Sequence, residues 1–221
     1  MDFDEALSIL RNHNNFTTER ERLQYEILVA AIDNLIDFAA AEEMTMISEL
    51  SEEVDEVCLL DYETICEQYN LTYAEAENEQ VLFAAKMAAW WRAVNTESVI
   101  TYMTQGDERV RPGHLSLDGV AYRKSEVPAE LIPPIEWGCR CYLNANGFAG
   151  VRASLSNDKC RSMVDPVFRE SLATGGRIFT DAHRYIVKTL PEFAQKIGRR
   201  LKSKFYEQVN DCPILCTVAK R

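Results

Sequence analysis

Residues 96–143 decide the architecture of this chain; they run TESVITYMTQGDERVRPGHLSLDGVAYRKSEVPAELIPPIEWGCRCYL. Glycine and proline recur through this stretch, and short β-branched and aromatic runs lie between them, at 98–103, 120–122 and 141–143. Short runs of this kind, separated by turn-forming residues, predict strands joined by loops. We therefore expect a small α+β core here.

On the N-terminal side of this core, the spacing of apolar residues predicts an arm made mostly of helices. Thr18 and Glu21 form a capping box, in which the threonine hydroxyl accepts a hydrogen bond from a first-turn amide. Behind it, apolar residues recur every three or four positions and form one stripe: Leu23, Ile27, Ala31, Leu35 and Phe38. A second helix is predicted over 51–69, and a third begins at Thr72 with Glu75 three residues later.

On the C-terminal side, the sequence predicts a basic amphipathic helix. Thr189, Pro191 and Glu192 supply a cap, a first-turn proline and a capping acid. Every fourth residue that follows is apolar: Phe193, Ile197, Leu201, Phe205 and Val209. The other sides carry the cations Lys196, Arg199, Arg200, Lys202 and Lys204. We expect the apolar stripe to dock on the rest of the chain and the cations to contact polyanions.

The distribution of charge divides the chain in the same way. Residues 1–80 hold 21 acidic residues and 3 arginines, whereas residues 150–221 hold 14 basic and 7 acidic residues. We therefore predict an acidic helical region (1–95), a core (96–150) and a basic C-terminal region that completes the core (151–221). Such asymmetry indicates two different partners, or one end of the chain neutralising the other.

The composition of the whole chain is that of a soluble globular protein, with 47% hydrophobic and 27% charged residues among 221. No segment approaches the roughly 20 apolar residues of a membrane-spanning helix, and the acidic N-terminal stretch argues against a secretory signal. The seven cysteines are an odd number, which argues against a fully paired disulfide framework and for a reducing cytoplasm. We expect no membrane partner.

The stretch quoted above resembles the core motif of the phage Mu F-type head morphogenesis proteins. Their pattern has Gly-Asp-x-Arg-Val-Arg-Pro-x-His after a strand, then Leu-Asp-Gly, a variable insert and Pro-Pro-x-x-Trp-x-Cys-Arg-Cys. The matching residues are Gly106, Asp107, Arg109, Val110, Arg111, Pro112, His114, Leu117, Asp118, Gly119, Pro133, Pro134, Trp137, Gly138, Cys139, Arg140 and Cys141. The resemblance covers roughly residues 90–190. One departure is the pair Ile135-Glu136, where family members often have Asn-Gly.

This resemblance implies a minor head protein of a phage or prophage, present in the virion and made in the cytoplasm of a bacterial host. Such a protein associates with the portal vertex and the head interior, and takes part in head assembly or in the fate of DNA on ejection. The portal and other capsid proteins are then its partners, with the acidic arm as an adaptor and the basic region on DNA. We expect no catalytic activity.

The motif residues expected to have a structural or binding role are Asp107, Arg109, Arg111, His114, Asp118, Trp137, Cys139, Arg140 and Cys141. On a strand, the guanidinium groups of Arg109 and Arg111 share one face. This pair suits the recognition of phosphate or carboxylate. It suits equally an internal ion-pair network with Asp107, Glu108 or Asp118, which is the interpretation that we favour.

His114, Cys139 and Cys141 form the constellation with metal-ligand chemistry, because zinc favours thiolate and imidazole in a tetrahedral arrangement. Asp118 is the candidate for a fourth ligand. In a first alternative no metal is bound: His114 hydrogen-bonds a backbone carbonyl, and both cysteines pack as small apolar residues. In a second, the same four residues form the site of a zinc- or cysteine-dependent enzyme, with Asp118 orienting the ring. The first alternative is favoured.

Overall fold

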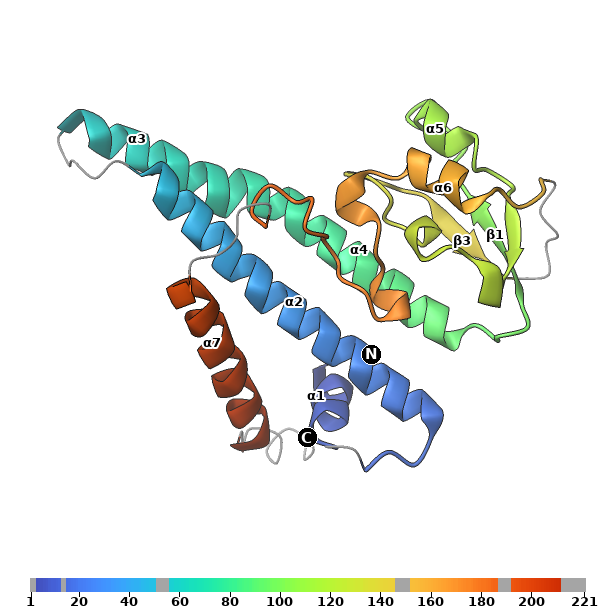
Figure 1. Ribbon diagram of the computed structural model, residues 1–221, viewed down its shortest axis with the longest axis horizontal. Helices are drawn as coiled ribbons and strands as arrows, with labels where there is room; N and C mark the ends of the chain where they lie inside the picture. The colour runs from blue at the N-terminus through green and yellow to red at the C-terminus, as the bar shows by residue number, and fades with distance from the viewer. Residues whose placement is uncertain (1–2, 13–14, 51–55, 146–151, 187–191, 212–221) are drawn as a thin grey trace, which may run out of the picture.

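The structure, a computed structural model, describes residues 3–12, 15–50, 56–145, 152–186 and 192–211. Figure 1 shows a long helical arm joined to a small unit of strands and short helices. The protein is mostly helical with a small antiparallel sheet, and the predicted α+β class is confirmed. Within these ranges no helix has the length and apolar character needed to cross a membrane.

The arm consists of α1 (Phe3–Arg11), α2 (Glu19–Glu49), α3 (Glu56–Glu67) and α4 (Ala74–Ala93). The predicted start of α2 is confirmed, because the Thr18 hydroxyl accepts a hydrogen bond from the Glu21 N–H at 3.2 Å. In turn, the Glu21 carboxylate accepts from the Thr17 N–H at 2.8 Å. α2 and the rod formed by α3 and α4 lie side by side in opposite directions, and the end that they share projects beyond the rest of the molecule (Figure 1).

The predicted start of a third helix at Thr72 is wrong. α3 continues into a π-helical stretch, Gln68–Tyr73, and this leads directly into α4. The flanking residues Glu67 and Ala74 keep right-handed helical backbone angles, and residues 56–93 contain no glycine or proline that could end the helix. Thr72 therefore lies inside one continuous rod, where it cannot serve as a cap.

α2 lies between two apolar clusters. Ile27, Ala31 and Phe38 face the main core together with α4, as the predicted stripe requires. Leu35, a member of the same stripe, is instead 37% exposed. A second set of α2 side chains, among them Leu28, packs in a smaller cluster with α1 and the C-terminal helix. The helix is therefore apolar on two sides. The sequence analysis predicted one apolar stripe and missed the second.

The three predicted strands are confirmed as β1 (Val99–Met103), β2 (Ala121–Arg123) and β3 (Tyr142–Asn144). β1 is central and pairs antiparallel with both neighbours, so the order is β2-β1-β3. Ile100 lies opposite Tyr122, and Tyr102 lies opposite Leu143. Between β1 and β2 the chain forms the short helix α5 (Pro112–Leu115), and between β2 and β3 it forms the 3-10 turns Lys124–Glu126 and Ala129–Leu131.

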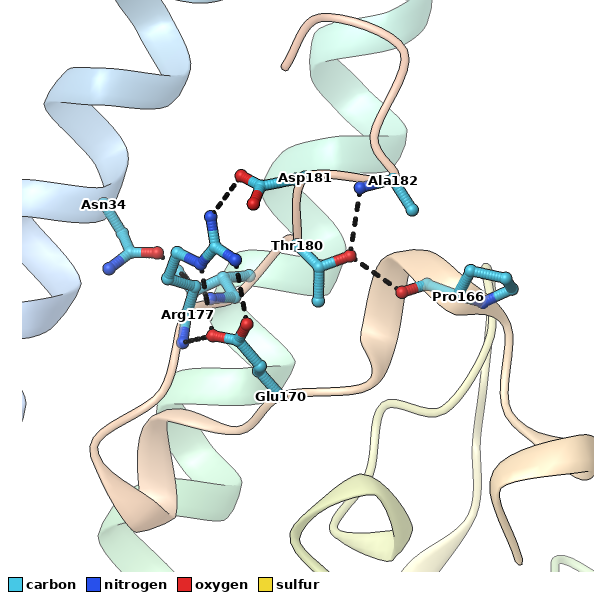
Figure 2. Close-up of polar contacts among 8 residues, drawn as sticks. Asn34, Pro166, Glu170, Arg177, Thr180, Asp181 and Ala182 are labelled. Carbon is cyan, nitrogen blue, oxygen red and sulfur yellow. Dashed lines mark hydrogen bonds and ion pairs between the residues drawn. The ribbon is translucent and has the colours of Figure 1, made fainter. Parts of the chain in front are cut away.

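The segment 152–186 covers the sheet and then crosses the arm. Its first helix, α6 (Asn157–Met163), contacts the sheet through Cys160, whose sulfur lies 3.2 Å from the Tyr122 hydroxyl. The 3-10 turns Pro166–Phe168 and Leu172–Thr174 follow. Figure 2 shows the next part, in which Arg177 lies between two carboxylates beside α2 and α4. The sheet, α4 and this segment thereby bury one continuous apolar core.

The basic helix α7 (Glu192–Asp211) packs along α2 on the side away from α4 (Figure 1). Ala194 is buried in this contact and Val209 in the smaller cluster. The predicted apolar stripe is wrong at Ile197 and Leu201, which are 49% and 48% exposed. Because an α-helix has 3.6 residues per turn, positions four apart drift by about 40° at each step. A stripe of this spacing therefore winds away from a straight contact line.

Candidate functional site: a histidine–cysteine cluster in the motif loop

The long loop after β1 is held in place by carboxylates. The backbone N–H and the hydroxyl of Thr104 both donate to Oδ1 of Asp118, at 2.6 and 2.9 Å. Farther along, Asp107 accepts two hydrogen bonds of 2.7 Å from the guanidinium of Arg140, one at each oxygen. The Arg140 contact lowers the pKa of Asp107, as expected for a carboxylate in a bidentate pair. These bonds connect the beginning of the motif to its Cys-Arg-Cys end.

The expectation that Arg109 and Arg111 lie on a strand is wrong. Residues 107–110 form a turn, and Arg111 is the residue that precedes α5. Gly106, with φ of 66°, and Pro112 bound this stretch, and neither suits a continuous strand. The ion pair that the structure gives Arg111 is with Glu136, where Nε lies 3.4 Å from Oε1.

His114 lies at the centre of the site. It is 4% exposed in α5, where Pro112 occupies the first turn. Its Nε2 lies 2.9 Å from Oε2 of Glu136, and its Nδ1 lies 3.3 Å from Sγ of Cys141. The ring therefore contacts a carboxylate on one side and a sulfur on the other. The alternative without a metal expected His114 to hydrogen-bond a backbone carbonyl. At Nε2 the structure shows the Glu136 carboxylate as the partner instead.

Cys139 and Cys141 complete the cluster. Both are buried, at 5% and 4% exposure, and one ligand atom of each lies within 4.8 Å of one of His114. Hydrogen bonds from the Cys141 thiol and from His114 lower the pKa of Cys139 to about 4. The same contact raises the pKa of Cys141, because a second thiolate beside the first is unfavourable. Contact with Cys139, and then with Glu136, raises the pKa of His114.

The structure thus brings together three of the four residues predicted as metal ligands. Among the described residues they are the one group of three potential ligands that meet within 4.8 Å. Asp118 binds Thr104 instead. Sequence reasoning missed two residues of the site. Glu136 was only a departure from the family pattern, and Tyr102, a buried residue of β1 beside the thiols of Cys139 and Cys141, was one aromatic residue of a strand. Neither carries a local sequence signal, because contacts across the fold create their roles.

A small hollow opens beside the cluster. Its volume is about 20 Å³, and it is lined by His114 and Cys141 together with Gln105, Arg109, Val110, Arg111, Gly138 and Arg140. A space of this size accommodates about one water molecule. The cluster is therefore shielded from larger molecules and lies beneath three cationic side chains.

Trp137 lies on the other side of the motif, in an aromatic cluster. Its ring stacks on Phe179 at 5.4 Å and meets Phe168 edge-on at 5.0 Å. His183, 2% exposed, lies 5.6 Å from the same ring, and burial lowers its pKa to about 4. Trp137 therefore ties the motif to the segment that crosses the arm.

The predicted DNA-contacting side chains lie on α7. Lys196, Arg199, Arg200 and Lys204 are exposed. Lys202 differs from them, because its side chain is 24% exposed and its Nζ lies 2.7 Å from Oδ2 of Asp37 on α2. One basic residue of this helix is thus neutralised by the acidic arm.

The second half of the arm, the motif loop and the sheet follow one another in the chain, and this region is similar to a known class of phage proteins. Residues 42–144 match the family described as Phage Mu protein F like protein. These residues, just under half of the chain, form a Mu F-like region, and the similarity to a Mu-like prophage F protein agrees with this match. The expected extent of roughly 90–190 differs from this match at both ends: the match begins in the second half of α2 and ends at the last residue of β3, so it does not include 145–190.

Two relatives share short stretches with the chain. The Mu-like prophage FluMu F protein of Haemophilus influenzae is 35% identical over 63 residues, which are 28% of this chain and 15% of that protein. An uncharacterised protein of Methanocaldococcus jannaschii is 50% identical over 42 residues, 19% of this chain and 7% of that protein. The chain therefore spans a small part of either relative. No solved structure matches it significantly.

Proposed function

We propose that this protein is a minor head protein that acts in head morphogenesis, at the portal and the interior of the capsid, and that it contacts DNA. The observation that carries the proposal is the family match over residues 42–144. A head role is what this family implies, and the prophage origin of one relative agrees with it. The portal and DNA roles rest on the two charged surfaces described next.

The acidic arm supports the role of an adaptor for the portal or another capsid protein. Its tip projects beyond the rest of the molecule (Figure 1), so a partner can reach it from several sides. On α3, Asp61, Glu63 and Glu67 are exposed, and the apolar side chains Ile47 and Leu71 are 48% and 65% exposed nearby on α2 and the π-helical stretch. A surface that combines acidic and apolar groups suits a protein partner and repels DNA.

The portal role is tested by co-purification with the portal protein of the same phage. We expect the portal to retain the wild-type chain and to lose a triple variant, Asp61→Lys, Glu63→Lys and Glu67→Lys. The control reverses two exposed acids outside the arm, Glu97→Lys and Glu108→Lys, and should bind as wild type. Equal retention of both variants would remove the arm from the interaction.

The outward face of α7 supports contact with DNA. Its exposed cations lie between positions 196 and 204, and α2 packs against the opposite side of the helix. Phosphate contacts of this kind are independent of sequence and weaken steeply as the salt concentration rises. Lys202 is better assigned to the contact with Asp37 than to DNA.

The DNA role is tested by charge reversal on α7. We expect the double variant Arg199→Glu with Arg200→Glu to lose most of its affinity for duplex DNA at low salt, with an unchanged melting temperature. The matched control, Lys159→Glu with Arg161→Glu, reverses exposed charges on α6. If both variants lose affinity equally, the binding reflects overall charge and not α7.

The role that we propose is structural and not catalytic. The sulfur atoms of the motif belong to residues that are at most 5% exposed, and the hollow beside them is about 20 Å³. A nucleophile needs space for its substrate next to the attacking atom. We therefore assign the His–Cys cluster to the stability of the motif.

A further inference from the structure

We propose that His114, Cys139 and Cys141 bind one zinc ion, with Glu136 and Tyr102 supporting the ligands and a water molecule in the fourth position. This inference is independent of the proposed role in the phage head. It rests on four features: the convergence of the ligand atoms, the orientation of the imidazole, a buried hydroxyl beside the two thiols and the hollow beside the site.

The three ligand atoms are close to a coordination shell. Zinc binds sulfur at about 2.3 Å and nitrogen at about 2.0–2.1 Å in a tetrahedral arrangement, which places neighbouring ligand atoms about 3.4–3.8 Å apart. Here the Nδ1 to Cys141 Sγ distance is 3.3 Å, and the three ligand atoms lie within 4.8 Å of one another. Small side-chain rotations are therefore enough to surround an ion.

The contact with Glu136 selects the imidazole nitrogen that binds the metal. A carboxylate only accepts hydrogen bonds, so Glu136, 2.9 Å from Nε2, requires the proton on that nitrogen. In the neutral imidazole that binds a metal, the lone pair is then on Nδ1, which lies 3.3 Å from Sγ of Cys141. A carboxylate on the outer nitrogen is the usual support of a zinc-binding histidine. Arg111 in turn contacts Glu136 and holds the carboxylate in position.

Tyr102 places a buried hydroxyl beside the two cysteines. The residue is 2% exposed, and in the part of the chain that the structure describes its hydroxyl makes no hydrogen bond of good geometry, although both thiols lie close to it. Buried polar atoms without a partner are rare. The thiols of Cys139 and Cys141 are its neighbours. When zinc binds, the remaining thiol protons leave to solvent, and the thiolates offer the tyrosine O–H a permanent acceptor.

The fourth position faces the hollow of about 20 Å³, which touches both His114 and Cys141. Its size suits one water molecule, and Gln105 is a polar side chain on its wall. Two thiolates and a neutral imidazole balance the charge of a divalent zinc ion. The ion would join α5 to the Cys-Arg-Cys segment and so fix the two ends of the motif loop.

The test uses the purified full-length protein, equilibrated with zinc and then dialysed. We expect about one zinc per chain by mass spectrometry. Replacement by Co²⁺ should give the thiolate-to-cobalt charge-transfer band and the intense visible bands of a tetrahedral site. Cys139→Ser with Cys141→Ser should abolish both signals, whereas Cys66→Ser, a change to a cysteine on α3, should leave them unchanged. Glu136→Gln should weaken zinc binding by about 10–100-fold with the fold retained.

Three results overturn the inference: no bound zinc in the wild-type protein, a cobalt complex without thiolate bands, or zinc retained by the double serine variant. If the double serine variant does not fold, the cobalt spectrum of the wild-type chain decides, since it reports sulfur ligands directly. Loss of portal or DNA binding in the variants above has no bearing on this result.

Discussion

Removal of the Glu170 carboxylate should destabilise the segment that crosses the arm. Glu170 accepts three hydrogen bonds from Arg177, from the backbone N–H at 3.0 Å, Nε at 3.1 Å and a terminal nitrogen at 2.8 Å (Figure 2). Asp181 contacts the same guanidinium from the other side (Figure 2). The two carboxylates differ in exposure, at 36% for Glu170 and 75% for Asp181. Their contributions to stability should differ accordingly.

The size of the effect follows from these contacts. Glu170→Ala leaves a partly buried N–H without its acceptor, which costs about 1–2 kcal/mol. The ion pair, discounted because both side chains are more than a third exposed, adds about 0.5 kcal/mol. We expect a total near 2 kcal/mol, or a fall of about 4–8 °C in the melting temperature. Glu170→Gln keeps an acceptor and should cost about half as much, and Asp181→Ala at most about 0.5 kcal/mol.

The assay is thermal and urea unfolding at neutral and acidic pH. Arg177 lowers the pKa of Glu170, so the contribution of this carboxylate is present above its unfolded pKa and is lost as the pH falls through the folded value. The gap between Glu170→Ala and wild type should therefore narrow in acid. Equal losses from Glu170→Ala and Asp181→Ala, or a gap that does not change with pH, would refute this reasoning.

Three further changes test other parts of the fold. Gly176→Ala should destabilise the fold by about 1–3 kcal/mol, because a Cβ there would lie 3.1 Å from the backbone N of Ser171. Gly113→Ala is the control, since a Cβ there would have no atom within 4 Å. Equal melting temperatures of the two variants would contradict this prediction. Burial, and then repulsion by Glu77, raises the pKa of Glu42 to about 7, so wild-type stability should fall as the pH rises from about 4.5 to 7. The free energy of unfolding of Glu42→Gln, relative to wild type, should therefore rise by about 1–2 kcal/mol between pH 5 and pH 8. If urea unfolding gives the same difference between variant and wild type at every pH, the buried Glu42 carboxylate is not its cause. Trp137→Leu should cost about 2–3 kcal/mol through lost contact with its aromatic neighbours, and a loss below about 1 kcal/mol in the same assay would show that the cluster tolerates repacking.

The strands and the start of α2 could be predicted because their signals are local. Thr18 and Glu21 lie within one helical turn, so their mutual contacts depend on little beyond the sequence between them. The strands lie between turn-forming residues of fixed conformation, such as Gly106 and Gly119, whose φ angles are positive. The motif residues were found for the same reason: their order along the chain is itself the signal.

Local signals failed where packing decided the outcome. Thr72 has the sequence of a cap, yet the chain continues through it in the π-helical stretch that joins α3 to α4. Ile197 and Leu201 have the spacing of a buried stripe, yet the contact line of α7 on α2 runs past them. The acidic partner of Lys202 lies 165 positions away in the sequence, and no pattern within α7 indicates it.

The sequence by itself determined the similarity to the Mu F-like family, the α+β class and the set of residues worth testing as a site, because each depends on residue types and their order. Tertiary structure alone decided which of those residues meet. In the fold Asp118 accepts a hydrogen bond from Thr104 and does not join the cluster. Glu136 contacts His114, and Tyr102 lies beside the two cysteines. Contacts between residues far apart in the chain depend on how helices and strands pack, and packing is a property of the whole fold.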